Sequence, residues 1–468
     1  MRTRTPESAR RATDTPSQCV PRPRLRPVCA GVLCAAIAAL AAIAQPAPAQ
    51  GGIDAAEAGR IFKEVRALCD RDGGALWGTT LDGPLLLLDE NTGDVVANGP
   101  DYQNRLKSKG EAFAGVLHDA DKISDNLLRW AGVTWTVLAW PLPEDPFARN
   151  KLILHECYGR IADRLGVPAG KVANDQLDTK DGRLWLQLEW RALNKALVGS
   201  KDGRKRAAQD ALVFRAYRRS LFSGSAETER VAEARDGLGE YTGVVLGTKN
   251  RAEATAYAAG SLLGAQSLPV FSHIFSYLSG PAYGLLLDDA KPGWQKTFAG
   301  TDDLGTLLAA ALGVIPPEDL KATAEGRASA YGGKELAAAE EKAAARKREE
   351  AAAIRARFVE GPVLDIPTAR GFNYSYDAAG KVPIPGLGTV YAYVRVFAAW
   401  GSLEADEGAL LLVKEGQVAG IRVPAPKDPS ARPVVGEGWT LKLQPGWKLF
   451  PGQRAGDWEL REALAGAP

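Results

Sequence analysis

The stretch Leu152-Ile-Leu-His-Glu-Cys-Tyr-Gly-Arg160 decides the fold of this chain, because it places a histidine and a glutamate side by side in an apolar segment with helical spacing. It follows residues 133–140, in which Val, Thr and Trp alternate and predict a strand that stops at Pro141. Asn150 is the expected N-cap of the helix. The pattern therefore predicts a strand followed by a helix that presents the His-Glu pair.

His155 and Glu156 are the residues of this stretch that carry chemistry. In an HExxH helix, two histidines at i and i+4 share one face and bind Zn²⁺, while the glutamate acts as general base on the metal-bound water. Here the i+4 position is Gly159. Cys157 points about 200° away from His155 around the helix, and Asp163 lies two turns on, roughly 12 Å away. The helix therefore supplies a single metal ligand.

A second segment, Asp236-Gly-Leu-Gly-Glu-Tyr241, resembles the Glu-Gly-Leu-Ala-Glu-Tyr segment of gluzincins, the HExxH zinc peptidases. The resemblance implies zinc as cofactor, Asp236 as a metal ligand, Glu240 as an alternative ligand and Glu156 as general base. Over roughly residues 75–290 the chain is also similar to a group of exported bacterial proteins with a His-Glu-x-Phe-His-Arg helix. The matching landmarks are Trp77-Gly with Gly83-Pro, residues 177–183 with 188–193, and residues 279–288.

The departures from the family pattern leave two interpretations of function open. Catalytic zinc normally has three protein ligands and an open position for water, whereas His155 alone of the implied ligand set is unchanged. The first interpretation is a non-catalytic binding or scaffold protein with a degenerate zinc site, which takes a peptide or protein ligand in the inherited cleft. The second is an active zinc peptidase that uses His155, Asp236 or Glu240 and one further donor, with Glu156 as base.

Other side chains offer alternative chemistry. Three tyrosines could donate a hydroxyl to a developing oxyanion or simply fill the core, namely Tyr241, Tyr277 and Tyr283. Glu189 lies in an apolar helical segment, where an unpaired carboxylate is costly, so it is either a site residue or half of an ion pair. A pair of Glu156 and Glu189 could also serve glycoside hydrolysis if the two carboxylates faced each other.

The remaining polar groups are expected to be structural. His273 lies in an apolar segment and His118 in a polar one, and neither is expected to be a ligand. A basic helix over residues 203–222 is expected to present a solvated face; its cations are Arg204, Lys205, Arg206, Arg215, Arg218 and Arg219. Residues 50–468 hold 51 basic and 54 acidic side chains, a net charge of about −3, so nucleic acid is not an expected partner.

The first 49 residues have the order of regions found in a secretory signal peptide. An Arg- and Pro-rich start precedes an apolar run at residues 30–44, and small residues at Ala47 and Ala49 mark a cleavage site near Ala49. The run is shorter than the ~20 residues of a membrane span. The mature chain is therefore expected to be exported, periplasmic or extracellular, with no transmembrane span. It keeps Cys69 and Cys157, which form either one disulfide or two separate buried thiols.

Composition divides the mature chain into three parts. Residues 50–330 combine a small β-sheet with helices and are expected to form a zincin-like, catalytic-type α+β domain. Residues 331–358 are rich in Ala, Glu, Lys and Arg and predict a charged connecting helix. Residues 359–468 alternate between apolar and polar side chains and predict an all-β C-terminal module. The expected fold class is α+β.

Overall fold

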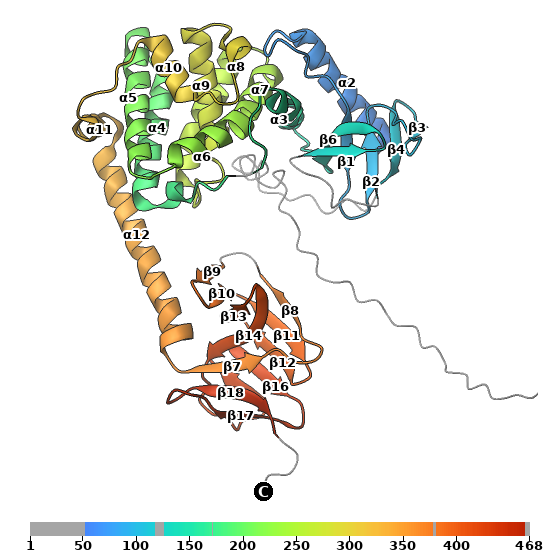
Figure 1. The fold of residues 1–468 in the computed structure, drawn as a ribbon, viewed down its shortest axis with the longest axis vertical. Coiled ribbons are helices and arrows are strands. Elements are labelled where there is room, and N and C mark those ends of the chain that lie inside the picture. Colours follow the sequence, from blue (N-terminus) through green and yellow to red (C-terminus); the bar gives the residue numbers. More distant parts are fainter. Residues whose placement is uncertain (1–51, 118–125, 171, 378–380, 464–468) are drawn as a thin grey trace, which may run out of the picture. The chain divides into compact units, whose positions relative to one another are not determined.

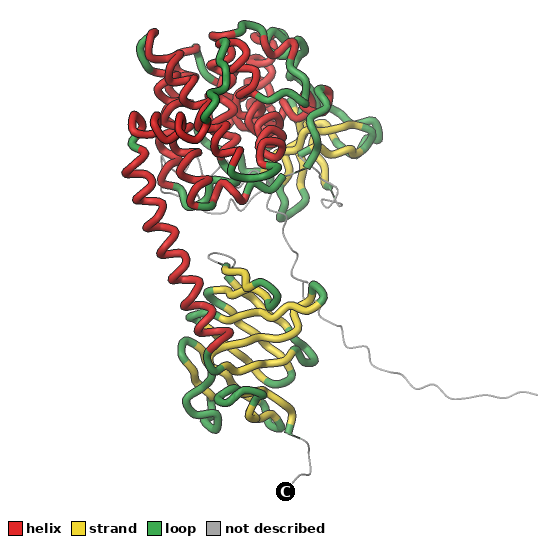
Figure 2. Tube along the Cα trace, turned by 60° about the vertical axis from the view of Figure 1, so that its left-hand side comes forward, coloured by secondary structure: helices red, strands yellow, loops and turns green. Residues whose placement is uncertain are grey.

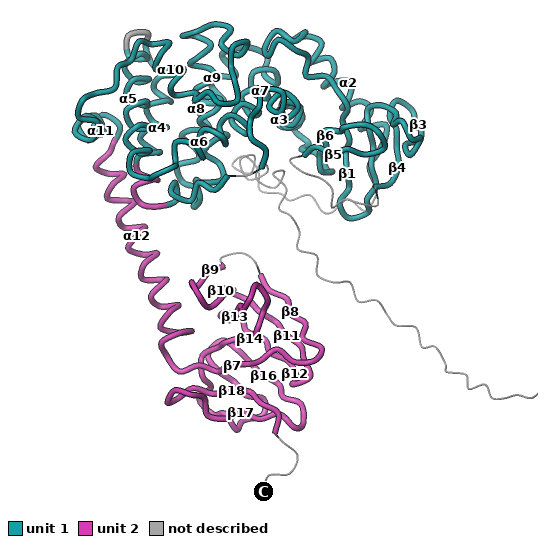
Figure 3. The backbone as a smooth tube through the Cα atoms, viewed as in Figure 1, with its two compact units in different colours: residues 1–178, 185–331 teal, residues 179–184, 332–468 magenta. Residues whose placement is uncertain are grey.

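The computed structural model describes residues 52–117, 126–170, 172–377 and 381–463. The chain is mixed, with about 47% helix and 21% strand, and its C-terminal region is rich in strands, which confirms the α+β prediction (Figure 1). It forms two compact units. The first comprises residues 1–178 and 185–331, and the second comprises residues 179–184 and 332–468 (Figure 3).

The first unit begins with a helix and a small sheet. Helix α2 (Ala55–Asp72) starts at Asp54, whose carboxylate accepts from the backbone N–H of Ala56. The six strands run in the order β3-β4-β2-β1-β6-β5, and β1 pairs in parallel with β6. Their bounds are β1 (Leu85–Leu88), β2 (Asp94–Ala97), β3 (Lys107–Lys109), β4 (Ala112–Val116), β5 (Leu127–Trp130) and β6 (Val133–Ala139). All four leucines of β1 are buried, as expected for a strand in the middle of a sheet.

Helices form the rest of the first unit and gather beside the sheet, as Figure 2 shows in red and yellow. They are α3 (Pro146–Arg164), α4 (Lys180–Val198), α5 (Lys201–Ser220), α6 (Ser225–Ala232), the π-helix η3 (Glu233–Gly237), α7 (Leu238–Gly247), α8 (Arg251–Gly264), α9 (Phe275–Ala290), α10 (Leu304–Leu312) and α11 (Leu320–Ala328). Short 3₁₀ turns join several of them, namely η2 (Asp175–Asp178), η4 (Ala265–Ser267), η5 (Trp294–Thr297) and η6 (Ser329–Tyr331). Among the helices of the described residues, none is both long enough and apolar enough to pass through a bilayer.

Helix α3 begins one turn earlier than the sequence predicts. Its N-cap is Asp145, whose carboxylate accepts from the Ala148 N–H at 2.8 Å, and Pro146 follows at the first helical position. Asn150, the expected cap, lies inside the helix and is buried, and its amide donates to Glu64 at 2.7 Å. The Asp-Pro pair is therefore the start signal, and the N-cap prediction for Asn150 is wrong.

Helix α9 is a buried helix that the sequence analysis did not assign, because Gly280 and Pro281 lie within it. The glycines allow close packing. A Cβ on Gly280 would lie 2.3–2.4 Å from backbone atoms of Gly237 in η3, and a Cβ on Gly284 would lie 2.4 Å from the ring of Tyr241. Close approach of α9 to η3 and α7 therefore depends on residues without side chains.

The second unit contains the charged helix and the β-rich region. Helix α12 (Gly333–Arg355) buries only Gly333, Leu336 and Glu340, and the π-helix η7 (Ala356–Glu360) follows it. One sheet has the order β17-β18-β7-β14-β13-β10-β9 and the other has the order β15-β16-β12-β11-β8. Their strands are β7 (Val363–Pro367), β8 (Asn373–Tyr376), β9 (Val382–Ile384), β10 (Gly388–Tyr391), β11 (Val394–Ala398), β12 (Gly401–Ala405), β13 (Ala409–Lys414), β14 (Gln417–Pro424), β15 (Val434–Gly436), β16 (Trp439–Leu443), β17 (Trp447–Pro451) and β18 (Trp458–Glu462). Residues of both sheets, Trp400 among them, share one buried core.

Candidate functional site

The His-Glu pair lies where α3 packs against α7. The side chain of His155 is buried, and its ring lies parallel to the ring of Tyr277 on α9 with centroids 5.4 Å apart. Gly239 of α7 also lies against the ring, since a Cβ built on it would be 3.1 Å from the Cε1 and Nε2 atoms of His155. The imidazole is therefore held by packing on two elements besides its own helix.

Glu240 of α7 is the charged residue at the centre of the site. Its Oε1 contacts the ammonium of Lys151 and accepts from the hydroxyl of Tyr257 at 3.3 Å, while its Oε2 lies 3.4 Å from Nδ1 of His155. Burial would raise the pKa of Glu240, but the charges of Lys151 and of the nearby His155 imidazole lower it to about 2. Glu240 is therefore an anion that is already paired with a cation of the chain.

The pKa of His155 also depends on the Glu240 carboxylate. Burial alone would lower the pKa of its imidazole, but the nearby carboxylate of Glu240 and the charges of Glu156 and Asp236 raise it overall. Lys151 lies one turn before His155 on α3, so the two side chains lie on the same face of the helix. The site thus combines a lysine, a histidine with a raised pKa and a buried carboxylate.

Glu156, the expected general base, lies half-buried beside this group. Its Oε2 accepts from the amide of Asn126, which immediately precedes β5, at 2.6 Å. Burial raises the pKa of Glu156, and although His155 and Asn126 lower it, the net shift is upward. Asp236 is partly exposed in the π-helix η3, and its charge acts on both His155 and Glu156. The π-helical turn places this carboxylate at the same end of the site as the His-Glu pair.

The donor set does not fit a zinc ion. His155 and a carboxylate are present, but Gly159 provides no donor, and a Cβ built there meets no described atom within 4 Å. Glu240, the alternative ligand, contacts Lys151 and His155 through its two oxygens. Within the part of the chain that the structure describes, no group of three His, Cys, Asp or Glu side chains is arranged to hold a metal ion. Lys151 was missed by the sequence analysis, although its position four residues before His155 could have indicated it.

Two of the three candidate tyrosines, Tyr241 and Tyr283, donate their hydroxyls to carboxylates away from His155. Tyr241 donates to Oδ1 of Asp288 at 2.7 Å, and Tyr283 donates to Oε1 of Glu189 at 2.8 Å. Both are fully buried, and burial with the neighbouring carboxylate raises the pKa of each phenol well above its ordinary value. Tyr277, by contrast, does lie at the site, against the ring of His155.

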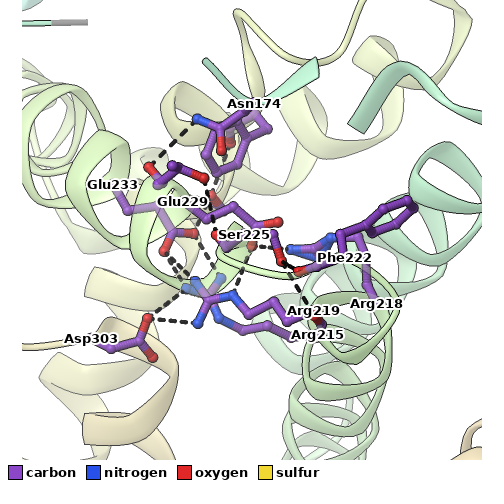
Figure 4. Close-up of polar contacts among 12 residues, drawn as sticks. Asn174, Arg215, Arg218, Arg219, Phe222, Ser225, Glu229, Glu233 and Asp303 are labelled. Atoms are coloured by element: carbon purple, nitrogen blue, oxygen red, sulfur yellow. Dashed lines mark hydrogen bonds and ion pairs between the residues drawn. The ribbon is translucent and has the colours of Figure 1, made fainter. Parts of the chain in front are cut away.

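A second cluster, the buried arginine cluster, draws its residues from α4, α5, α6, η3 and the N-cap of α10. Figure 4 shows its three arginines with Glu229, Glu233 and Asp303. It comprises Arg215, Arg218, Arg219, Glu189, Glu229, Glu233 and Asp303. Arg218 is fully buried and donates to Glu189 at 2.6 Å and to Glu229 at 2.8 Å. Arg215 donates to Glu233 and Asp303, and Ser279 of α9 donates to Glu233 at 2.7 Å.

This cluster corrects the expectation that residues 203–222 present a solvated face. Arg204, Lys205 and Arg206 are exposed, but Arg215 and Arg218 are buried among carboxylates. Glu189 is accordingly half of an ion pair, with Arg215 and Arg218 as its partners. Both carboxylate oxygens of Glu189 accept hydrogen bonds from arginines of this cluster. Glu189 therefore does not form a pair of catalytic carboxylates with Glu156, as a glycosidase would require.

The remaining histidines and the cysteines were also singled out by sequence. His273 is exposed although its neighbours in the sequence are apolar, and His118 lies outside the described residues. Cys69 and Cys157 are two separate thiols, both buried, and burial raises the pKa of Cys69 to about 12. A cavity of about 420 Å³ is lined by residues of α2, α7 and α8 and includes none of the expected site residues.

Comparison with known proteins identifies no relative of this chain. No family model, curated protein or solved structure matches this chain.

Proposed function

We propose that the first unit is a metallopeptidase-like domain that binds a peptide or protein ligand without hydrolysing it. The observation that supports this most directly is the contact between the ammonium of Lys151 and the carboxylate of Glu240, beside His155. A buried carboxylate either pairs with a cation or takes up a proton, and Glu240 pairs with a cation. In a zinc enzyme the metal supplies that charge, whereas here a lysine supplies it.

Electrostatics favours the lysine over a metal at this position. The side chains of Lys151 and Glu240 are 10% and 2% exposed, so water screens little of the interaction between them. A divalent ion at the Glu240 carboxylate would lie close to the ammonium and would be repelled by it. Binding would therefore require Lys151 to move or to lose its proton, in addition to a second histidine that Gly159 does not supply.

An active zinc peptidase is the second candidate, and one observation favours it. Nδ1 of His155 faces a carboxylate oxygen of Glu240, which is how metal-bound histidines are commonly oriented so that Nε2 faces the metal. The upward shift in the pKa of Glu156 also suits a general base. This candidate requires Asp236 and a donor from outside the described cluster to complete the ligand set.

Metal content separates the two candidates. Residues 50–468 would be dialysed against zinc and analysed by mass spectrometry as the parent protein, as Gly159→His and as Gly159→His with Lys151→Ala. Gly260→His is the matched control, because Gly260 also lies within a helix and a Cβ on it likewise meets no described atom within 4 Å. We expect no stoichiometric zinc in the parent or the control and about one ion per chain in the double variant.

Each other result has a definite meaning. Stoichiometric zinc in the parent would reject the non-catalytic proposal and make peptide-cleavage assays with Glu156→Gln the next step. Absence of zinc from the parent and from both variants with histidine at position 159 would show that α3 and α7 do not form a gluzincin frame.

We also propose that the protein is exported with cleavage after Ala49, because of the order of regions in the leader. An intact mass that begins at Gln50 in the exported fraction checks this.

A further inference from the structure

Strand β8 is an edge strand without the features that usually protect edges. It ends the order β15-β16-β12-β11-β8, and its sequence Asn-Tyr-Ser-Tyr contains no charge and no proline (Figure 1). An edge of this kind carries unpaired backbone groups and is a template for pairing with another strand. Natural proteins normally prevent such pairing by placing Lys or Pro on the edge strand or by keeping the strand very short.

The other edge strands that the structure describes have such protection. Strand β3 is Lys-Ser-Lys, and β5 contains Arg129. In the second unit, β9 contains Pro383, β17 contains Lys448 and Pro451, and β15 has only three residues. Of the edges in the described residues, β8 alone is four residues long, uncharged and free of proline.

The register of β8 shows which backbone groups face outward. The N–H of Asp377 donates to the carbonyl of Tyr393, which makes these two a hydrogen-bonded pair of the ladder. Hydrogen-bonded and non-hydrogen-bonded pairs alternate in an antiparallel ladder. Ser375, opposite Arg395, therefore bonds to β11, whereas the backbone N–H and C=O groups of Tyr374 and Tyr376 point toward the open edge.

We propose that β8 is the interface of a two-fold dimer, in which it pairs antiparallel with β8 of a second copy of this chain. When Ser375 lies on the two-fold axis, Tyr374 of each copy is opposite Tyr376 of the other, and these are the residues whose backbone groups face outward. A two-fold interface brings one surface against itself, and β8 itself carries no charge. In this register Asp377, which follows β8 in the ladder, lies opposite Asn373 of the other copy, so no like charges meet.

The side chains support this register. Tyr374 and Tyr376 are opposite Val396 and Val394, both buried in the core, so the two tyrosines lie on the inner face of the sheet. Their rings are stacked with centroids 6.0 Å apart, and Tyr376 lies 4.2 Å from Tyr391 of the other sheet. Pairing would extend this aromatic row across the axis, and cross-strand aromatic pairs stabilise sheets. Ser375 at the axis is small and exposed, so its partner copy meets no bulky side chain.

Cysteine crosslinking tests the register directly. A pair at the axis that is not hydrogen-bonded has Cα atoms about 4.5 Å apart, within the range of a disulfide. Ser375→Cys should therefore crosslink to itself under mild oxidation. Asn373→Cys is the matched control: it is exposed and on the same strand face, but in this register its symmetry mate lies roughly 14 Å away. The variants are made in residues 50–468, where the native cysteines are Cys69 and Cys157, both buried, so the new thiol is the exposed one.

Sedimentation gives the second, independent measurement. The unmodified protein should pass from monomer to dimer between about 5 and 500 μM, because a short strand edge makes an interface at the weak end of the known range. Ser375→Glu places two like charges opposite each other at the axis and should shift this transition to at least tenfold higher concentration. Within each copy the new carboxylate lies opposite Arg395, so the thermal transition of the monomer should not fall. A protein that stays monomeric at 500 μM, or crosslinks equally well through Asn373→Cys, would overturn the proposal. A monomer that instead binds an extended peptide at β8 would also overturn it.

Discussion

Lys151 and His155 lie one turn apart on α3, and both face the carboxylate of Glu240. His155 stands out in the sequence as part of the His-Glu pair, whereas Lys151 does not, since a lysine in a helix is usually solvated. The two side chains form a charged site because Glu240, on a different helix, lies against both of them. Spacing within the sequence does not reveal that contact. The His-Glu pair was therefore recognised from the sequence, but the cation beside it was not.

The same limit applies to the buried arginine cluster. Residues 203–222 contain six basic residues and four alanines, a composition that also describes a solvated helix. The carboxylates that bury Arg215 and Arg218 come from α4, α6, η3 and the residue before α10. Burial of a charge is decided by such partners, so it follows from the fold and not from the helix itself.

Arg218→Met is expected to destabilise the protein by about 3–5 kcal/mol, because it leaves Glu189 and Glu229 buried without their main cation. Arg206→Met, on the exposed part of the same helix, should change stability by less than about 0.5 kcal/mol. Urea unfolding of both variants at pH 7 measures the difference. Equal effects would show that the cluster contributes no more to stability than a surface arginine.

The pH dependence of this loss follows from the carboxylates. Burial would raise the pKa of Glu229, but the charges of Arg218 and Arg219 lower it below its ordinary value of 4.5. A lowered folded-state pKa stabilises the fold above the unfolded-state pKa, and this stabilisation is lost as pH falls through the folded-state pKa. The gap between parent and Arg218→Met should therefore be full at pH 7 and narrow below about pH 4.5. A gap that widened on acidification would contradict this assignment.

At the scale of elements, sequence patterns located the helices and strands with regular spacing. Strand β6 matches the strand expected over residues 133–140, α3 is the expected helix that presents the His-Glu pair, and α12 lies within the charged helix expected over residues 331–358. Helix α9 was missed because the Ser-Gly-Pro-Ala sequence at residues 279–282 is typical of a turn. Its glycines serve packing instead, and only the neighbouring η3 and α7 reveal that use.

Two glycine substitutions should therefore have opposite effects on stability. Gly280→Ala places a methyl group 2.3–2.4 Å from backbone atoms of Gly237, so the helices must separate, and we expect a loss of about 1–3 kcal/mol. Gly260→Ala, in the exposed middle of α8, meets no described atom within 4 Å and should gain about 0.5–1 kcal/mol in helix propensity. Thermal unfolding of the two variants measures both signs. A stabilising Gly280→Ala would show that α9 does not pack as closely as described.

For the whole molecule, the two units differ in how much of their structure sequence alone could indicate. In strands of the second unit such as β11 and β16, side chains alternate between the core and the outer face of the sheet. The core between the two sheets is formed by side chains of that unit. The site in the first unit depends on contacts among α3, α7, α8, α9 and η3, which are distant in sequence. The second unit should accordingly be the one that folds without the rest of the chain.

Residues 332–468 expressed alone are therefore expected to unfold in one cooperative transition. Trp400 gives a matched test of the core, because it is fully buried and its Nε1–H donates to the carbonyl of Pro367 at 3.1 Å. Trp400→Ala should cost about 3–5 kcal/mol in this fragment. The same substitution in the chain from residue 50 should lower the stability of the second unit by an equal amount, within about 0.5 kcal/mol, since effects at independent sites add. Urea unfolding followed by far-ultraviolet circular dichroism measures both costs. A fragment that unfolds gradually, or a cost that changes with the presence of the first unit, would mean that the β-rich region relies on the helical unit for its stability.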